Sequence, residues 1–91
     1  MTDLSKIRDQ INDIDEQIIK LWKERMALSL LVAEYKKENN LSILDEQREN
    51  ELLDRISGLA GEDLEDYSRE LYSEILRISR DYQERRIKGD L

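Results

Sequence analysis

Apolar residues recur along the first part of the chain at alternating spacings of three and four residues. The series is Leu4, Ile7, Ile11, Ile14, Ile18, Leu21, Leu28, Val32 and Tyr35, with Arg25 at its one polar position. This heptad pattern is typical of a long amphipathic helix that packs along its whole length. No glycine or proline interrupts it. We therefore expect one helix over residues 3–39, capped by Thr2 or Asp3 and about 50 Å long.

Two shorter amphipathic patterns follow. The second helix is expected over residues 45–57, beginning near a pair, Ser42 and Asp45, that resembles a capping box. The third is expected over residues 63–86, although the charged tail from Glu84 is expected to fray. The apolar positions are Leu52, Leu53 and Ile56 in the second helix, and Leu64, Tyr67, Leu71, Ile75, Ile78 and Tyr82 in the third. The plan is a long, a short and a medium helix.

Composition supports a single all-α domain over residues 1–91. The chain has 41% charged residues, no proline and only three glycines. Its hydrophobic content of 38% is modest, and the first helix is longer than a compact fold of this size needs. We therefore expect a second copy of the chain to complete the burial of apolar surface.

Several function classes are disfavoured by composition. The chain has neither cysteine nor histidine, so it lacks thiolate chemistry, the commonest metal ligand and the usual general base. A net charge of −7 disfavours nucleic acid and anionic membranes as partners. No signal peptide or membrane-spanning run is present, which favours a cytoplasmic location. An anionic ligand would need a local cluster of cations.

Arg25 is the first candidate for such a cluster, because it occupies the apolar seam of the first helix. Its guanidinium stays charged, and burying it without a partner is costly, so a carboxylate or a ligand must pair with it. Lys36 follows eleven residues later on the same face, about 16 Å along the axis. Ser29 and Val32 lie between them, which makes a shelf with positive ends. Taken alone, Lys36 is better interpreted as a solvated lysine at a helix end.

Other polar residues share faces in all three helices. Arg8 lies seventeen residues before Arg25, about 25 Å away along one helix, so it can serve the same site only from an antiparallel second chain. The others are Asp45, Arg48 and Glu49 in the second helix, and Ser79 and Gln83 in the third. Each alone is compatible with an ordinary surface residue. Together they suit an oxygen-rich dianion, whereas no spacing suggests a metal site or a nucleophile with its base.

The order of these residues resembles that of the all-helical (type II) chorismate mutases. The motifs that carry the resemblance are I-R-D-Q-I-N-D-I-D at 7–15, L-W-K-E-R at 21–25, V-A-E-Y-K at 32–36, D-E-Q-R-E at 45–49 and S-R-D-Y-Q at 79–83. The resemblance covers about residues 4–83. It implies an intertwined antiparallel homodimer with three helices per chain and two active sites, each completed by Arg8 from the other chain.

The resemblance also implies how the carboxylates of chorismate are held. Arg25 would bind one carboxylate, helped by Arg8 of the second chain, and Arg48 and Ser79 would complete the carboxylate contacts. The implied reaction is the intramolecular [3,3] rearrangement of chorismate to prephenate, in the synthesis of phenylalanine and tyrosine. It needs no cofactor and no metal.

The remaining implied roles concern the ring hydroxyl and the ether oxygen of chorismate. Glu49 and the backbone at Asp45 would hold the hydroxyl, and Lys36 and Gln83 would both donate to the ether oxygen. With Arg25, the last two form the implied catalytic set. The chain departs from the family in lacking proline at 41–44, before the second helix.

Two alternatives to a chorismate mutase remain open from the sequence. The same scaffold serves isochorismate-pyruvate lyases and aminodeoxychorismate mutases, whose substrates are close analogues. Glu49 together with Gln83 favours chorismate. The second alternative is a non-catalytic helical dimerisation module, which the complete polar set disfavours.

Overall fold

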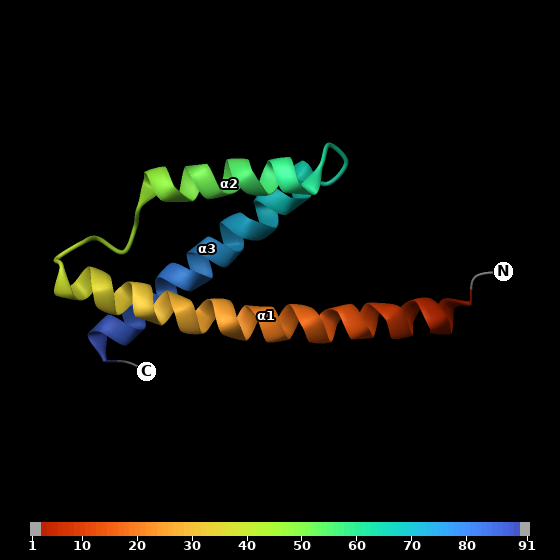
Figure 1. Ribbon diagram of the computed structural model, residues 1–91, viewed down its shortest axis with the longest axis horizontal. Helices are drawn as coiled ribbons and strands as arrows, with labels where there is room; N and C mark the ends of the chain where they lie inside the picture. The colour runs from red at the N-terminus through yellow and green to blue at the C-terminus, as the bar shows by residue number, and fades with distance from the viewer. Residues whose placement is uncertain (1–2, 90–91) are drawn as a thin grey trace.

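The computed structural model describes residues 3–89, so Thr2, one of the two expected caps, lies outside the described residues. Figure 1 shows three helices, α1 (Leu4–Glu38), α2 (Glu46–Ala60) and α3 (Glu65–Lys88). No strand occurs among residues 3–89. The expected all-α class and the order of long, short and medium helix are confirmed.

The ends of α1 follow from local sequence. The Asp3 carboxylate accepts a hydrogen bond of 2.9 Å from a backbone N–H of the first turn. At the other end, the Leu41 N–H donates to the Lys36 carbonyl at 2.8 Å and the Asn40 N–H donates to Lys37 at 3.3 Å. Asn40 has a φ of 54°, and asparagine tolerates this left-handed conformation better than most residues. These bonds form a Schellman motif, which turns the chain away from α1.

The bounds of α2 differ from the expected ones at both ends. Its cap is Asp45 and not Ser42, because Asp45 directly precedes the first helical residue and accepts from the Arg48 N–H at 3.1 Å. The helix also continues through Gly58. It ends before Gly61, whose φ of 83° is readily adopted by glycine alone. A single glycine inside a helix lowers its stability without breaking it.

The C-terminal part of α3 is helical where fraying was expected. The helix passes Glu84 and extends to Lys88, and Gly89 ends it with a φ of 79°. Arg86 Nη2 lies 3.6 Å from Glu34 Oε1, which ties the last turns of α3 to α1. The expected fraying from Glu84 was therefore wrong within residues 84–89.

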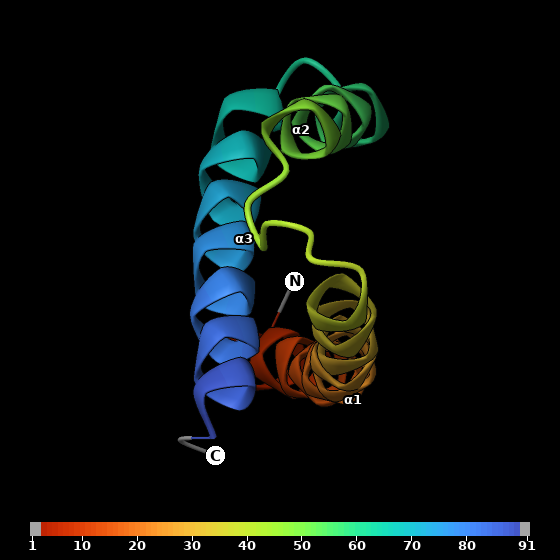
Figure 2. The ribbon, with the colours of Figure 1, turned by 90° about the vertical axis from the view of Figure 1, so that its left-hand side faces the viewer.

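The three helices are arranged around α3. It packs against both α1 and α2, which do not pack directly against each other among the described residues. Figure 2 shows α1 and α2 on the same side of α3, and Figure 1 shows the N-terminal half of α1 extending beyond the other helices. The resulting shape measures 58 × 29 × 14 Å. A site shared by all three helices must lie over α3, between α1 and α2.

The single chain has no closed hydrophobic core. Its radius of gyration is 16.5 Å, whereas a compact domain of this length has about 12 Å. The buried residues are Ser29 and Ala33 in α1, Leu52 in α2, and Leu76, Ser79 and Gln83 in α3. The apolar seam of α1 is instead 36–62% exposed. Every residue from Asp3 to Leu21 is exposed, so an apolar helix face lies open in the isolated chain.

Candidate active site

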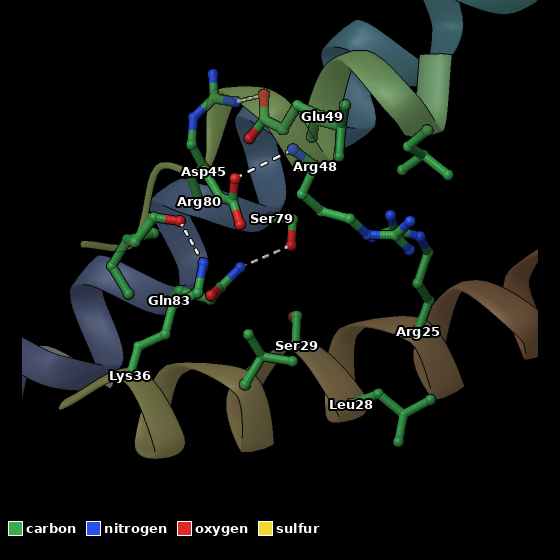
Figure 3. A pocket seen from close by; sticks show the side chains of 14 residues that line it. Arg25, Leu28, Ser29, Lys36, Asp45, Arg48, Glu49, Ser79, Arg80 and Gln83 are labelled. Atoms are coloured by element: carbon green, nitrogen blue, oxygen red, sulfur yellow. Dashed lines mark hydrogen bonds and ion pairs between the residues drawn. The ribbon is translucent and has the colours of Figure 1, made fainter. Parts of the chain in front are cut away.

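A cavity of about 340 Å³ lies over α3, between the C-terminal half of α1 and the N-terminal half of α2 (Figure 3). Its lining residues are Arg25, Leu28, Ser29, Val32 and Lys36 from α1, Ile43 from the connection, Asp45, Arg48, Glu49 and Leu52 at α2, and Leu76, Ser79, Arg80 and Gln83 from α3. The structure thus brings together seven of the eight site residues expected from the sequence. The eighth, Arg8, lies outside.

Arg8 is exposed on the N-terminal half of α1. Because α1 is one uninterrupted helix, Arg8 stays about 25 Å from Arg25 along its axis. A single chain therefore cannot bring Arg8 into its own cavity.

The α1 wall of the cavity has a cation at each end. Figure 3 shows Arg25 at one end and Lys36 at the other, with Ser29 between them. Ser29 is buried, and its hydroxyl donates to the Met26 carbonyl at 2.8 Å, so it adds little polarity to the wall. The Lys36 ammonium donates to the carbonyl of Ile43 at 2.7 Å. An ammonium has three N–H donors, so this contact orients Lys36 while leaving donors for a ligand.

The first turn of α2 supplies the second wall. Asp45 caps the helix through the Arg48 N–H, which places both residues at the cavity rim. Figure 3 shows the Arg48 side chain extending to the end of the cavity where Arg25 lies. Two guanidiniums at one end suit a carboxylate, which Arg binds with parallel N–H donors.

The floor of the cavity is the most buried part of α3. Ser79 is 4% exposed and Gln83 is 7% exposed. The Gln83 amide nitrogen donates to the Ser79 hydroxyl at 3.1 Å, and its oxygen Oε1 is buried with no partner among the described residues. Buried amide oxygens are normally hydrogen-bonded. The amide nitrogen has two N–H donors, so one remains for a ligand beside the bond to Ser79.

Arg80 is the charged lining residue that the sequence did not single out. The Arg80 guanidinium on α3 forms an ion pair with the Glu49 carboxylate on α2. The available signal was its place in the motif 79–83, three residues before Gln83 and so on a neighbouring helix face. An arginine on a charged helix gives no further local sign of a partner that is 31 residues away. Ile43 was missed as well. It contacts Lys36 through its backbone carbonyl, so its side chain gives no sign of this contact in the sequence.

The cavity has the opposite charge to the chain as a whole. Four cations, Arg25, Lys36, Arg48 and Arg80, face two carboxylates, Asp45 and Glu49, so the lining has a formal charge of +2. The whole chain has a formal charge of −7. This local excess favours a ligand with two negative charges.

Two other features, a cluster of metal ligands and a membrane-spanning helix, are absent from residues 3–89. No group of three or more histidine, cysteine, aspartate or glutamate side chains is placed to hold a metal ion there. In the same part of the chain, no helix has both the length and the apolar character that crossing a bilayer requires.

Comparison with known proteins identifies the family. The family model for chorismate mutase type II matches residues 7–84. This chain belongs to the type II chorismate mutase family. The resemblance drawn from the sequence motifs is thereby confirmed.

Curated relatives are similar over parts of the chain. A chorismate mutase of Methanocaldococcus jannaschii is 42% identical over 59 residues, which cover 65% of this chain and 60% of that protein. A bifunctional chorismate mutase/prephenate dehydratase of Buchnera aphidicola is 45% identical over 49 residues, covering 54% of this chain. That match spans only 13% of the Buchnera protein, so the similarity concerns a small part of it.

One solved structure shares the fold. A conserved hypothetical protein from Pyrococcus furiosus is 37% identical, with a TM-score of 0.76. The match covers 91% of this chain and 97% of the Pyrococcus chain. The Pyrococcus protein therefore shares the fold of this chain over nearly the whole length of both chains.

Proposed function

We propose that this chain is a chorismate mutase, which rearranges chorismate to prephenate on the route to phenylalanine and tyrosine. The observation that carries the proposal is the gathering of seven expected residues from three helices in one cavity with a charge of +2. Chorismate carries two carboxylates, and its two negative charges match the formal charge of +2 in the cavity lining. Membership of the family and the similarity to the Methanocaldococcus enzyme support the same activity.

The proposed reaction asks little covalent chemistry of the protein. One C–O bond of chorismate breaks as one C–C bond forms, no proton is transferred, and no nucleophile is needed. The first task of the site is therefore to select the compact, reactive conformer of a flexible substrate. Arg25 and Arg48, which lie at the same end of the cavity, would clamp a carboxylate with paired N–H donors.

The second task is to stabilise charge that develops during the reaction. As the C–O bond lengthens, negative charge grows on the ether oxygen. Lys36 and Gln83 would donate to this oxygen, with Lys36 held by Ile43 and Gln83 by Ser79. Donors that are fixed before the reaction act mainly on the transition state and raise kcat. The ring hydroxyl would be held by Glu49 and the backbone at Asp45.

We further propose that the enzyme is an antiparallel homodimer. The exposed seam of α1 gives a second copy of the chain an apolar face to pack against. A long amphipathic helix left open in this way is more stable when paired. In an antiparallel pair, the N-terminal half of one α1 reaches the cavity of the other chain, and its Arg8 would add a third guanidinium beside Arg25 and Arg48.

If the enzyme is a homodimer, a charge placed in the apolar seam of α1 should strongly affect its oligomeric state and its activity. Ile11→Asp is expected to yield a monomeric, less helical and inactive protein, because it places an unpaired carboxylate in the interface. Ser5→Asp is the matched control, since it adds the same charge to the opposite face of the same helix half. Light scattering and circular dichroism at several concentrations measure both effects. An Ile11→Asp protein with wild-type mass and helix content would rule out this interface.

The amide at position 83 predicts the pH profile. Gln83 donates through Nε2 without a titratable proton, whereas a carboxylic acid in its place donates only when protonated. The rate is therefore expected to be flat from weakly acidic to weakly basic pH, and Gln83→Glu should shift activity to acid pH. Initial rates across this range test the assignment. An unchanged profile in Gln83→Glu would contradict it.

The activity itself is tested with purified protein. Chorismate should disappear while prephenate forms, and isochorismate and aminodeoxychorismate should be converted far more slowly. Product identification by chromatography separates a mutase from a lyase. Calorimetry with a bicyclic diacid that mimics the transition state separates an enzyme from a scaffold. A protein that neither converts chorismate nor binds this diacid is not a chorismate mutase.

A further inference from the structure

The Arg80–Glu49 ion pair differs from the other ion pairs of the described residues. The Arg80 side chain is 29% exposed and the Glu49 side chain 20%, whereas in every other pair both side chains are at least 40% exposed. It joins α3 to α2 and lines the cavity with both members. The other pairs have no member in the cavity lining. This pair is therefore the one that can affect a ligand there.

We propose that Arg80 is a positioning residue, which holds the Glu49 carboxylate in the orientation that accepts the hydrogen bond of the substrate's ring hydroxyl. The inference rests on the proposed function and adds a residue to it. Arg80 itself need not touch the substrate. Its guanidinium occupies one side of the carboxylate and leaves the acceptor sites of the other side for the hydroxyl.

The physical argument begins with the flexibility of glutamate. Its side chain has three rotatable bonds, and an unrestrained carboxylate at the cavity wall would sample several positions. An arginine partner is planar and directional, so it restricts both the position and the plane of the carboxylate. The restriction is imposed before the ligand binds. The hydroxyl then meets an acceptor that is already in place.

Stability is a weaker explanation of this pair. The cost of removing two charges from water offsets much of their attraction, so a partly buried pair contributes little net stability. The same helices are already joined by Arg69, which donates to Asp54 at 3.1 Å and to the Ser57 hydroxyl at 2.8 Å. What the Arg80 pair adds at the cavity is a fixed carboxylate.

The test compares two substrates, chorismate and its analogue in which hydrogen replaces the ring hydroxyl. The analogue retains the [3,3] system and both carboxylates. Arg80→Met is expected to lower the ratio of kcat/KM for chorismate over the analogue by roughly tenfold or more, the usual worth of a hydrogen bond to a charged group. A ratio is independent of the fraction of folded enzyme. It also cancels effects of charge that act on both substrates.

Arg77→Met is the matched control. Arg77 lies one turn earlier on α3, outside the cavity lining, and pairs with Glu74 on the same helix. The hydrogen bond from Arg77 lowers the pKa of the Glu74 carboxyl, so the control also removes an arginine–carboxylate pair. The substrate ratio of Arg77→Met should equal that of the wild type.

A double-mutant cycle with Glu49 separates positioning from other effects. Glu49→Gln should lower the ratio by itself, and adding Arg80→Met should lower it little further. If the two substitutions lower the substrate ratio independently, so that their effects multiply in the double variant, the proposal is overturned. A substrate ratio of Arg80→Met equal to that of the wild type would also overturn it. The latter would indicate a purely structural role or a direct contact with a carboxylate. A wild-type protein that does not convert chorismate removes both the proposed function and this inference.

Discussion

Lys36→Met is expected to lower kcat by at least about 10²–10³, the usual cost of losing one fixed donor to developing negative charge. Methionine has nearly the length of lysine without its ammonium, so the α1 wall keeps its shape. In the proposed mechanism, Lys36 is the cation at the ether oxygen. Its position is fixed by the 2.7 Å hydrogen bond to the Ile43 carbonyl. Gln83 alone would then face the developing charge.

The KM of Lys36→Met should change less than its kcat. The guanidiniums at the other end of the cavity still hold the carboxylate, so ground-state binding persists while transition-state stabilisation is lost. Steady-state kinetics with chorismate measures both constants, and circular dichroism checks the fold. Lys37→Met is the matched control, because Lys37 is exposed and does not line the cavity. A Lys36→Met enzyme with a near wild-type kcat would contradict the role of Lys36.

A mixture of Arg8→Ala and Arg25→Ala chains is expected to recover activity that each variant lacks alone. Each proposed site uses Arg25 of its own chain and Arg8 of the other chain. In a mixed dimer, one site therefore has both arginines and the other has neither. With random exchange between symmetric dimers, about a quarter of the wild-type activity per chain should return.

The complementation experiment needs proof that chains have exchanged. Tagging one variant and isolating the mixed dimer gives a sample in which about half of the sites are complete. Arg25→Ala mixed with the double variant Arg8→Ala/Arg25→Ala is the matched control, because no site in that mixture has both arginines. Verified mixed dimers that remain inactive would refute the shared site. Activity of Arg8→Ala alone would show that Arg8 is dispensable.

The sequence alone determined those features of the fold and the site that depend on residues close together along the chain. The seam from Leu4 to Tyr35 predicted α1 because helical periodicity is a local property, repeated over nine apolar positions. The same periodicity put Arg25 and Lys36 on one face, and α1 carries both into the cavity. It also showed that Arg8 lies too far from Arg25 for one chain to use both. Each of these conclusions needs only the rise and twist of one helix.

The face of α3 that is buried was decided by tertiary structure. The apolar pattern of the third helix pointed to six positions, and three of them, Leu64, Tyr67 and Leu71, are more than half exposed in the single chain. The residues that α3 buries are Leu76, Ser79 and Gln83, and all three line the cavity. An apolar pattern identifies a face that favours burial. It does not tell whether that face meets another part of the same chain or remains open.

The partner of Glu49 was also decided by tertiary structure. Glu49 and Arg80 are 31 residues apart, on helices joined by a reversal at Gly61. Whether their side chains meet depends on how α2 crosses α3, which no local spacing encodes. The sequence thus specified the helices and which residues each one offers to a ligand. The crossing of the helices over α3 decided which carboxylate is held by which guanidinium, because contacts between distant segments follow from packing geometry and not from periodicity.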